Sequence, residues 1–343
     1  MSKTVMKVSQ ALMNNVKIQG YSAIEKLVFA CNGTIFGGYV RDEYIKEYYT
    51  DKFSKELYRR VGGDAFWNKR MSPSTSARTI IASDMDICFP NNADADKFID
   101  RVKETSEFTF VVVKTKNAYI SPQMISAHYT VRICMKVGVI PFISEGEDLM
   151  LDLDMIVANT LPPFGNLDML CNGFIKTKEG KRFSRNTGTK LDKLSEFEHH
   201  REVMKILEDM MEFKTTLCFT QKRLTKKDLN ISALKRIQKM EKKDFSWTFT
   251  NMPINIECYS DEGLIEDTCC ICFEQFVNGE KISYTASKKE DKEIPASKMH
   301  YKCCMKYLEH QMDTVINTIS SSPYEFTFRC PCRNKIDFST CKI

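Results

Sequence analysis

The sequence lacks a long apolar run. No stretch reaches the roughly 18 residues that a membrane-spanning helix needs, and Met1 to Asn15 has no continuous apolar core of the signal-peptide kind. The excess of positive over negative charge is also small. The 50 Lys and Arg against 45 Asp and Glu leave a net charge of +5, which permits a nucleic-acid partner without requiring one. We therefore expect a protein without a membrane partner, in the reducing cytoplasm.

Cysteine, by contrast, is abundant, with 14 in 343 residues. Five cysteines are scattered among apolar residues, where a free thiol behaves as a small buried hydrophobe: Cys31, Cys88, Cys134, Cys171 and Cys218. Eight others crowd the C-terminal end: Cys269, Cys270, Cys272, Cys303, Cys304, Cys330, Cys332 and Cys341. Crowding of this kind in a reducing compartment indicates metal binding rather than disulfides.

The length predicts a large and a small domain. Apolar periodicity predicts helices over 4–30, 39–49, 93–107 and much of 191–243, and strands over 34–36, 79–89, 108–114, 131–137 and 149–157. This mixture predicts an α/β domain over 1–190 with a basic surface insertion near 52–76. A basic helical segment (191–250), a linker (251–266) and a cysteine-rich module (267–343) follow.

A strand–glycine–helix turn stands early in the large domain, where Thr34–Phe36 leads into Gly37 and Gly38. Glycine lets the backbone approach a ligand closely, and the N–H groups at a helix start attract anions. A tight corner between strand and helix explains two glycines equally well, so this turn alone leaves both interpretations open.

Two pairs of aspartates interrupt otherwise apolar strands, as Asp84 with Asp86 and Asp152 with Asp154. Residues two apart on a strand point to the same face, so each pair projects side by side. Crowded carboxylates repel each other, and a divalent cation relieves that repulsion. A solvated outer face of the sheet explains either pair alone; both pairs after a glycine turn favour a metal-dependent site.

The ordered set Gly37-Gly38-Tyr39-Val40-Arg41-Asp42, then Asp84-Met85-Asp86, resembles the head domain of CCA-adding enzymes and bacterial poly(A) polymerases, in the DNA polymerase β-like nucleotidyltransferase superfamily. Asp168 and Asn172 match a third motif of that group. The resemblance implies an α/β (α+β) nucleotidyltransferase palm with a mixed sheet over 1–190. It also implies transfer of a nucleotide from an NTP to a hydroxyl, an RNA 3′ end being one acceptor.

Roles for individual residues follow from this resemblance. Asp84 and Asp86 would hold Mg²⁺ or Mn²⁺, with Asp152 or Asp154 as the third carboxylate, a choice that the sequence leaves open. The implied nucleotide-binding residues are Gly37, Gly38, Arg41, Asp42 and Asn172, with the glycine amides on phosphate and Arg41 and Asp42 bracing the turn. The stretch between Gly38 and Asp84 is longer than in that group, and most of its tRNA-gripping helical body is missing, so nucleotide and acceptor stay open.

The C-terminal module carries two half-sites with metal-ligand spacing. Cys269 and Cys272 form a Cys-x-x-Cys pair, and His300 and Cys303 form a His-x-x-Cys pair. Four such ligands suit tetrahedral Zn²⁺, and a small module with few core residues needs a metal to fold. A coincidental cluster of thiols is the alternative.

The same motifs resemble a RING finger, a small zinc-bound treble-clef fold, with Ile271 inside the first pair and Cys330-Pro331-Cys332 near the end. That likeness implies a second zinc at Cys330 and Cys332, although the third and fourth ligands are missing before His300. Cys341 or Cys258 would complete this site, and the alternative is that the pair binds no metal. It leaves a RING-type ubiquitin ligase, or an interaction module that binds a ubiquitin-conjugating enzyme or another protein, as the alternative function. The pairing of the two modules is similar to proteins of large cytoplasmic DNA viruses, which implies a host-cell cytoplasm.

Basic residues crowd the segment 222–243, just before Trp247 and Phe249. A solvated helix face explains such a run in most proteins. Beside a polymerase-like site, the alternative is a track for a phosphate backbone, with the two aromatic rings stacking a base or closing the core.

Overall fold

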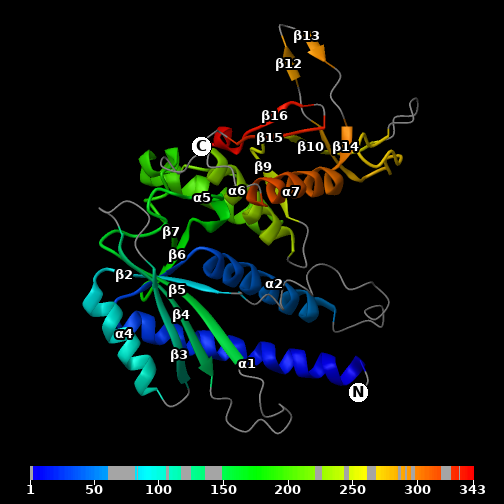
Figure 1. Cartoon of the computed structure of the whole chain (residues 1–343). Helices are drawn as coiled ribbons and strands as arrows, with labels where there is room; N and C mark the ends of the chain where they lie inside the picture. Colours follow the sequence, from blue (N-terminus) through cyan, green and yellow to red (C-terminus); the bar gives the residue numbers. More distant parts are fainter. Residues whose placement is uncertain are drawn as a thin grey trace. The chain divides into compact units, whose positions relative to one another are not determined.

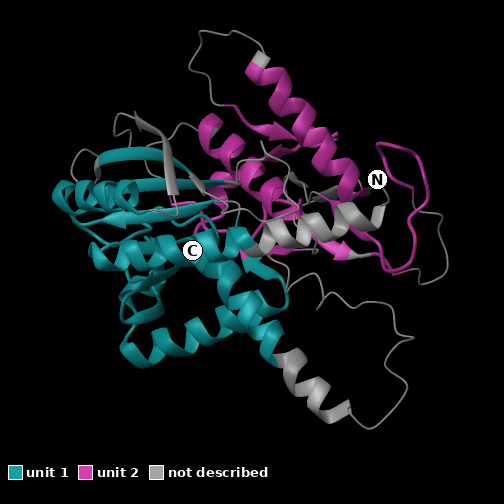
Figure 2. Cartoon of the chain, turned by 90° about the horizontal axis from the view of Figure 1, so that it is seen from below, with its two compact units in different colours: residues 1–215 teal, residues 216–343 magenta. Residues whose placement is uncertain are grey.

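The computed structural model of the chain describes residues 3–60, 82, 84–105, 108–116, 125–135, 149–220, 226–242, 247–260, 268–284, 287–289, 292–294, 298–317, 326–331 and 333–343. These residues form two compact units, Met1–Thr215 and Thr216–Ile343, which Figure 2 colours separately. The boundary lies later than the end of the α/β domain expected at 190. The reason is that α5 (Glu196–Met211) packs against the α2 helix of unit 1 (Gly38–Arg60).

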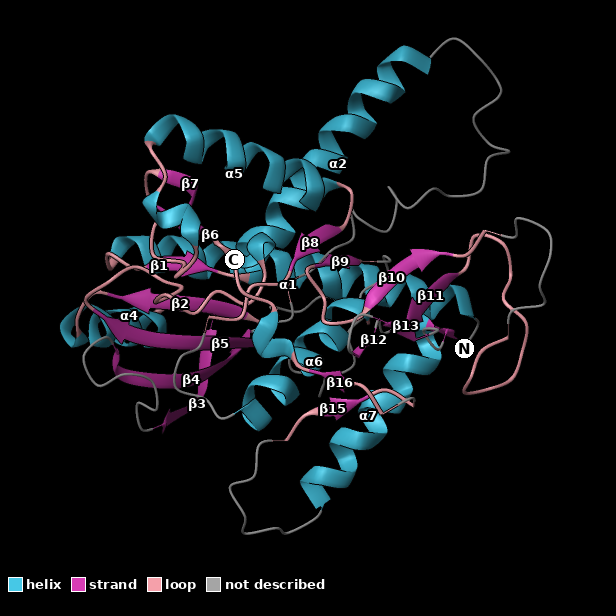
Figure 3. Cartoon of the chain, turned by 90° about the horizontal axis from the view of Figure 1, so that it is seen from above, coloured by secondary structure: helices cyan, strands magenta, loops and turns pink. Residues whose placement is uncertain are grey.

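Unit 1 is built on a seven-stranded sheet in the order β3-β4-β5-β2-β1-β6-β7. Its strands are β1 (Thr34–Phe36), β2 (Met85–Phe89), β3 (Phe108–Lys116), β4 (Ile125–Met135), β5 (Leu149–Ala158), β6 (Phe174–Thr177) and β7 (Gly180–Phe183). Strands β2 and β5 pair parallel, and the other neighbours pair antiparallel. Figure 3 shows these strands side by side. The prediction of an α/β fold with a mixed sheet is confirmed.

Alternating burial along the central strands gives the sheet two different faces. On β2, Met85 and Ile87 are fully buried while Asp86 between them is not. The apolar face packs against α1 (Lys3–Ala30) and α4 (Asn92–Glu104), where the rings of Phe89 and Phe98 lie 5.3 Å apart. Burying each large apolar side chain stabilises the fold by about 1.5–3 kcal/mol. The opposite face carries the aspartates.

Several elements differ from the sequence-based expectation. Helix α2 continues to Arg60, so the first part of the expected insertion at 52–76 is helical, and residues 61–81 lie outside the described residues. Strands β6 and β7 were not predicted, because each has only four residues and carries charged side chains. Their lysines, Lys176 and Lys181, pair with Glu43 on α2. That pairing ties the two strands to the helix layer.

Unit 2 joins the basic helix α6 (Lys226–Glu241) to the cysteine-rich module. Its other elements are β9 (Thr248–Thr250), β10 (Asn255–Cys258), β11 (Lys281–Tyr284), β12 (Ser287–Lys289), β13 (Lys292–Ile294), β14 (Lys298–His300), α7 (Tyr301–Asn317), β15 (Phe328–Arg329), β16 (Lys335–Ile336) and the short helix η4 (Phe338–Thr340). Strand β8 (Lys214–Thr216) lies at the unit boundary. Figure 1 labels most of them.

The later part of the expected helical segment, from residue 216, and the described part of the expected linker, residues 251–260, belong to this unit. Strand β10 falls in the expected linker, yet it pairs antiparallel with β11, which also pairs with β14. On α6, the fully buried Asn230 donates to the carbonyl of Phe326 at 3.0 Å and accepts from the N–H of Phe338 at 2.9 Å. Because α6 buries its apolar face against the module, the two do not form separate domains.

Candidate functional site

The aspartates lie opposite one another on two central strands. The parallel register of β2 and β5 sets Asp86 directly across from Asp154, flanked by the pairs Met85 with Leu153 and Ile87 with Met155. Since directly opposed residues share a face, Asp152 and Asp154 join Asp86 on the face away from the helices. Sequence spacing predicts each pair separately, and the sheet order brings Asp86 to the second pair. Asp84 directly precedes β2, which begins later than the strand expected over 79–89.

The neighbouring strand β4 supplies polar partners to the β5 carboxylates. Oδ1 of Asp154 lies 3.1 Å from Nε2 of His128 and accepts from the hydroxyl of Thr130 at 3.3 Å. Oδ1 of Asp152 accepts from Nε of Arg132 at 2.7 Å. Asp152 therefore pairs with a permanent cation, whereas Asp154 contacts an imidazole and a hydroxyl.

The glycine turn meets this face beside Asp86. Strand β1 pairs Phe36 with Asp86, and the next residue, Gly37, turns the chain at φ +71°. A Cβ on Gly37 would lie 3.1 Å from Oδ2 of Asp86, so only glycine allows this approach without displacing the carboxylate. The turn and the aspartates therefore form one site.

The amides of the turn are not equivalent. The N–H of Gly37 donates to the carbonyl of Phe174 at 3.2 Å, so it is engaged within the sheet. The first intrahelical bond of α2 runs from the N–H of Arg41 to the carbonyl of Gly37. The amides that open α2, beginning with Gly38, are therefore the ones that geometry leaves for an anion.

Arg41 and Asp42 brace the turn from inside the fold. Both are buried, and Nε of Arg41 donates to Oδ1 of Asp42 at 2.7 Å. A terminal nitrogen of Arg41 donates to the side-chain oxygen of Asn172 at 2.7 Å, and the Asn172 amide donates to Asp168 at 3.1 Å. Although burial opposes the charge, Asp42 raises the pKa of Arg41, so the guanidinium stays charged. The motif residues from distant segments thus form one network.

Charge from the aspartates also reaches the helix layer. Burial, together with the charges of Asp84 and Asp152, raises the pKa of Tyr21 on α1. The two aspartates therefore lie close enough to the same ring to act on it jointly. They nevertheless do not form a compact ligand cluster. Among the described residues, only the cysteine and histidine group brings three or more potential metal ligands together, with all ligand atoms within 4.8 Å of one another.

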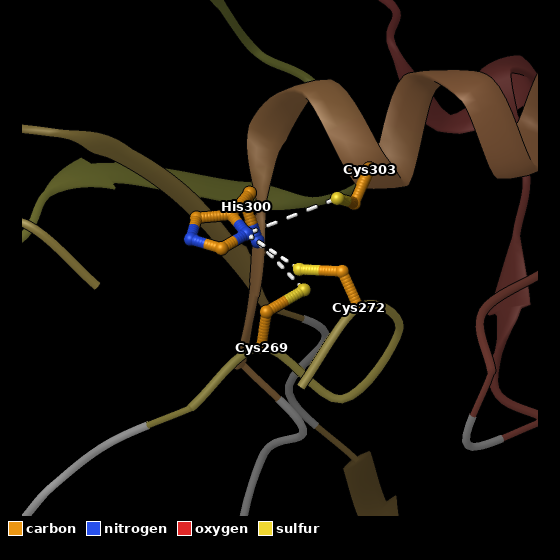
Figure 4. A group of neighbouring side chains, drawn as sticks. All are labelled: Cys269, Cys272, His300 and Cys303. Carbon is orange, nitrogen blue, oxygen red and sulfur yellow. Dashed lines mark hydrogen bonds between the residues drawn. The ribbon is translucent and has the colours of Figure 1, made fainter. Parts of the chain in front are cut away.

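That group consists of Cys269, Cys272, His300 and Cys303, and its residues are positioned to hold a metal ion. Nδ1 of His300 lies 3.3 Å from Sγ of Cys272 and 3.8 Å from Sγ of Cys303, as Figure 4 shows. The first two cysteines come from a tight turn, His300 ends β14 and Cys303 lies in the first turn of α7. The predicted ligand set converges in space.

The thiols of this cluster are held in unequal electrostatic environments. Burial opposes ionisation of Cys269, but backbone N–H groups of Cys272, Ile271 and His300 outweigh it and lower the pKa of Cys269 to about 7. Burial and the neighbouring thiols raise the pKa of Cys303 to about 12. A divalent cation among these groups would relieve the crowding of sulfur charges, so the donor set fits a thiolate-binding metal.

The second predicted zinc site has a different status. Cys330 is disulfide-bonded, and Cys332 lies outside the described residues. Zinc is bound by thiolates, and a disulfide-bonded sulfur is not a thiolate. A metal at Cys330 and Cys332 would require reduction of that bond, and it stays a prediction. Four of the five scattered cysteines, Cys31, Cys88, Cys171 and Cys218, are buried as expected; the side chain of Cys134 lies outside the described part.

The basic segment is described from Lys226 to Lys242 only. On α6, Lys235, Arg236 and Lys239 are exposed, which fits a solvated helix face. Trp247 and Phe249 are 2% and 5% exposed, so the interpretation that they stack a base is wrong. They close the core of unit 2 because large aromatic rings find more apolar contact there than at the surface.

Comparison with known proteins finds no matching family model, no matching curated protein and no matching solved structure. In the part of the chain that the structure describes, no helix is long and apolar enough to cross a membrane. The functional argument therefore depends on the residues and geometry of the two sites themselves.

Proposed function

We propose that unit 1 is a metal-dependent nucleotidyltransferase that moves a nucleotide from an NTP to a hydroxyl acceptor. One observation carries the proposal: Asp86 and Asp154 oppose each other on parallel strands, and Gly37 turns the chain into a helix beside Asp86. Carboxylates beside a helix N-terminus suit a reaction in which a polyanion must be held and its negative charge balanced.

In this proposal the third carboxylate is Asp154. It lies directly across from Asp86, and its partners His128 and Thr130 orient it. Asp152 instead neutralises Arg132. The residues that would hold Mg²⁺ or Mn²⁺ are Asp84, Asp86 and Asp154, and the metal would balance phosphate charge and activate the acceptor hydroxyl.

The chain's own residues would position the reactants. Amides at the start of α2 bind the triphosphate, and Arg41 keeps the turn rigid through Asp42 and Asn172. The acceptor oxygen then bonds to the α-phosphorus, the bond to pyrophosphate breaks, and the acceptor proton leaves to solvent. Because the groups are preorganised, positioning and charge stabilisation supply most of the rate.

The decisive assay is incorporation of label from each NTP in turn into a mixed RNA pool, with Mg²⁺ or Mn²⁺. Wild type is compared with a double variant, Asp84→Ala with Asp86→Ala. We expect incorporation by wild type alone, and the preferred NTP would define the class. Absence of incorporation with every NTP and metal would refute the proposal for RNA acceptors.

For unit 2 we propose that the cluster of Cys269, Cys272, His300 and Cys303 binds a structural Zn²⁺. Three sulfurs and one imidazole nitrogen are the ligands that zinc prefers, and four protein ligands leave no open position for catalysis. The module would then serve as a binding platform. A parallel assay for ubiquitin-chain formation tests the ligase alternative, which Ile271 beside the cluster keeps open.

A further inference from the structure

The two ring nitrogens of His300 face different chemistry. Nδ1 points toward the sulfurs of Cys272 and Cys303. Nε2, on the other side of the ring, lies 3.4 Å from Oε2 of Glu280. A histidine that binds a metal through one nitrogen must carry its proton on the other, and the partner of that second nitrogen decides which tautomer forms.

The fold holds Glu280 at this position. In the antiparallel pair of β11 and β14, Ile282 lies opposite His300, and Glu280 directly precedes β11, at the end of the turn that leads into this strand. The Glu280 carboxylate also accepts from the backbone N–H of Val277 at 3.1 Å, and the backbone N–H of Glu280 donates to the Val277 carbonyl at 2.9 Å. The carboxylate is therefore fixed by a turn rather than carried on a free side chain.

The imidazole itself has little freedom. The His300 side chain is 10% exposed, against 35% for Glu280. The ring of Phe276 stands nearly perpendicular to it, with centroids 4.9 Å apart. A ring packed in this way cannot turn its other nitrogen to the sulfurs without moving Phe276. Orientation by packing and choice of tautomer by Glu280 therefore act together.

We propose that Glu280 is the positioning residue of the metal site: it accepts the Nε2–H of His300 and so presents the Nδ1 lone pair to the metal. This inference rests on the proposed zinc site and adds a residue that the ligand spacing does not include. A negative partner also makes the imidazole a stronger donor. Glu280 does not contact the metal.

The test is Zn²⁺ affinity of the full chain, measured by competition with a chromogenic chelator. We expect Glu280→Ala to weaken binding about tenfold to a hundredfold, as for other partners of metal-bound histidine. Glu280→Gln keeps an acceptor oxygen and should recover part of the loss. Glu309→Gln, the same charge change at an exposed position of α7, is the matched control and should leave the affinity unchanged.

The same Glu280 substitution in a variant without the imidazole separates an effect on His300 from a general loss of stability. With His300→Cys the site keeps four ligands but has no imidazole, so adding Glu280→Ala there should no longer change the affinity. An equal loss in both backgrounds, or no loss in either, would overturn the inference. Ring ¹⁵N shifts of His300 in the zinc-bound wild type should show metal on Nδ1 and a proton on Nε2; the opposite pattern would also overturn it. Wild type that binds no zinc would instead reject the metal site itself.

Discussion

The cysteine and histidine cluster and the aspartate-bearing face bring their ligands together in opposite ways. The cluster is formed by two short sequence motifs that lie close together in the fold, with all ligand atoms within 4.8 Å of one another. The aspartates come from two neighbouring parallel strands, where Asp86 and Asp154 lie in register on one face of the sheet. The first arrangement suits a metal that holds a fold, and the second suits a metal that arrives with a substrate and balances its charge.

The largest expected effect tests whether the cluster holds unit 2 together. Cys272→Ala removes one ligand, and apparent binding energies of structural zinc are about 10–16 kcal/mol. We expect zinc content to fall from about one per chain to near zero, with red-shifted emission as the buried Trp247 becomes exposed. Metal analysis and fluorescence measure both.

The matched control for this variant is Cys270→Ser. Cys270 stands between the ligands but outside the cluster, and burial raises its pKa. It should keep its zinc. Loss of zinc in Cys270→Ser but not in Cys272→Ala would mean that a different set of sulfurs binds the metal.

The next effect concerns activity rather than folding. Asp154→Asn should lower the rate of nucleotide transfer about 10³-fold, because a charge that stabilises the transition state contributes several kcal/mol. Asp152→Asn should lower it much less, since that carboxylate is paired with Arg132. Equal losses, or a larger loss in Asp152→Asn, would reverse our choice of the third carboxylate. Steady-state kinetics with unchanged circular dichroism is the measurement.

A smaller effect tests the turn that links the two halves of the proposed active site. Gly37→Ala puts a side chain at φ +71° and 3.1 Å from Asp86, which should cost about 1–2 kcal/mol of unfolding free energy. In Gly38→Ala the nearest atom is a terminal nitrogen of Arg41 at 3.4 Å, an ordinary contact distance, and alanine is a better helix former than glycine, so no loss of unfolding free energy is expected. Denaturant unfolding compares the two. Similar costs at both positions would show that the left-handed turn does not form.

The smallest effect is a pH dependence confined to unit 1. Burial, assisted by Arg185, lowers the pKa of His199 on α5. Unfolded chains bind the proton below the ordinary pKa near 6.5 and the folded chain resists it, so the unfolding free energy should fall as pH drops below about 6.5. The slope should shrink in His199→Phe. An unchanged slope would assign the pH dependence to other groups.

How much of this could be predicted from sequence depends on how local the information is. The ligands Cys269, Cys272, His300 and Cys303 were predictable because the two members of each pair are separated by only two residues in the chain and zinc geometry supplies the rest. The alternation of Asp84 with Asp86 also predicts a shared face. These patterns need no knowledge of which strands are neighbours.

The rest depended on tertiary contacts. The pairing of Asp86 with Asp154 depends on the order of strands in the sheet, which no motif encodes. Strand β10 has a linker-like sequence, and it forms a strand by pairing antiparallel with β11. Trp247 beside a basic run resembled a stacking platform, but its side chain is buried. Glu280 carries no motif at all, and it reaches His300 from the turn before β11, a tertiary contact that the sequence does not indicate.

The central claim is that the chain carries two separate sites, one for a structural zinc and one for nucleotide transfer. It is tested most directly by measuring zinc content and label incorporation on the same preparations of wild type, Asp86→Asn and Cys303→Ser. The account predicts that Asp86→Asn keeps its zinc and loses transfer, whereas Cys303→Ser loses its zinc. Transfer that survives in Asp86→Asn, or zinc that disappears with it, would contradict the account.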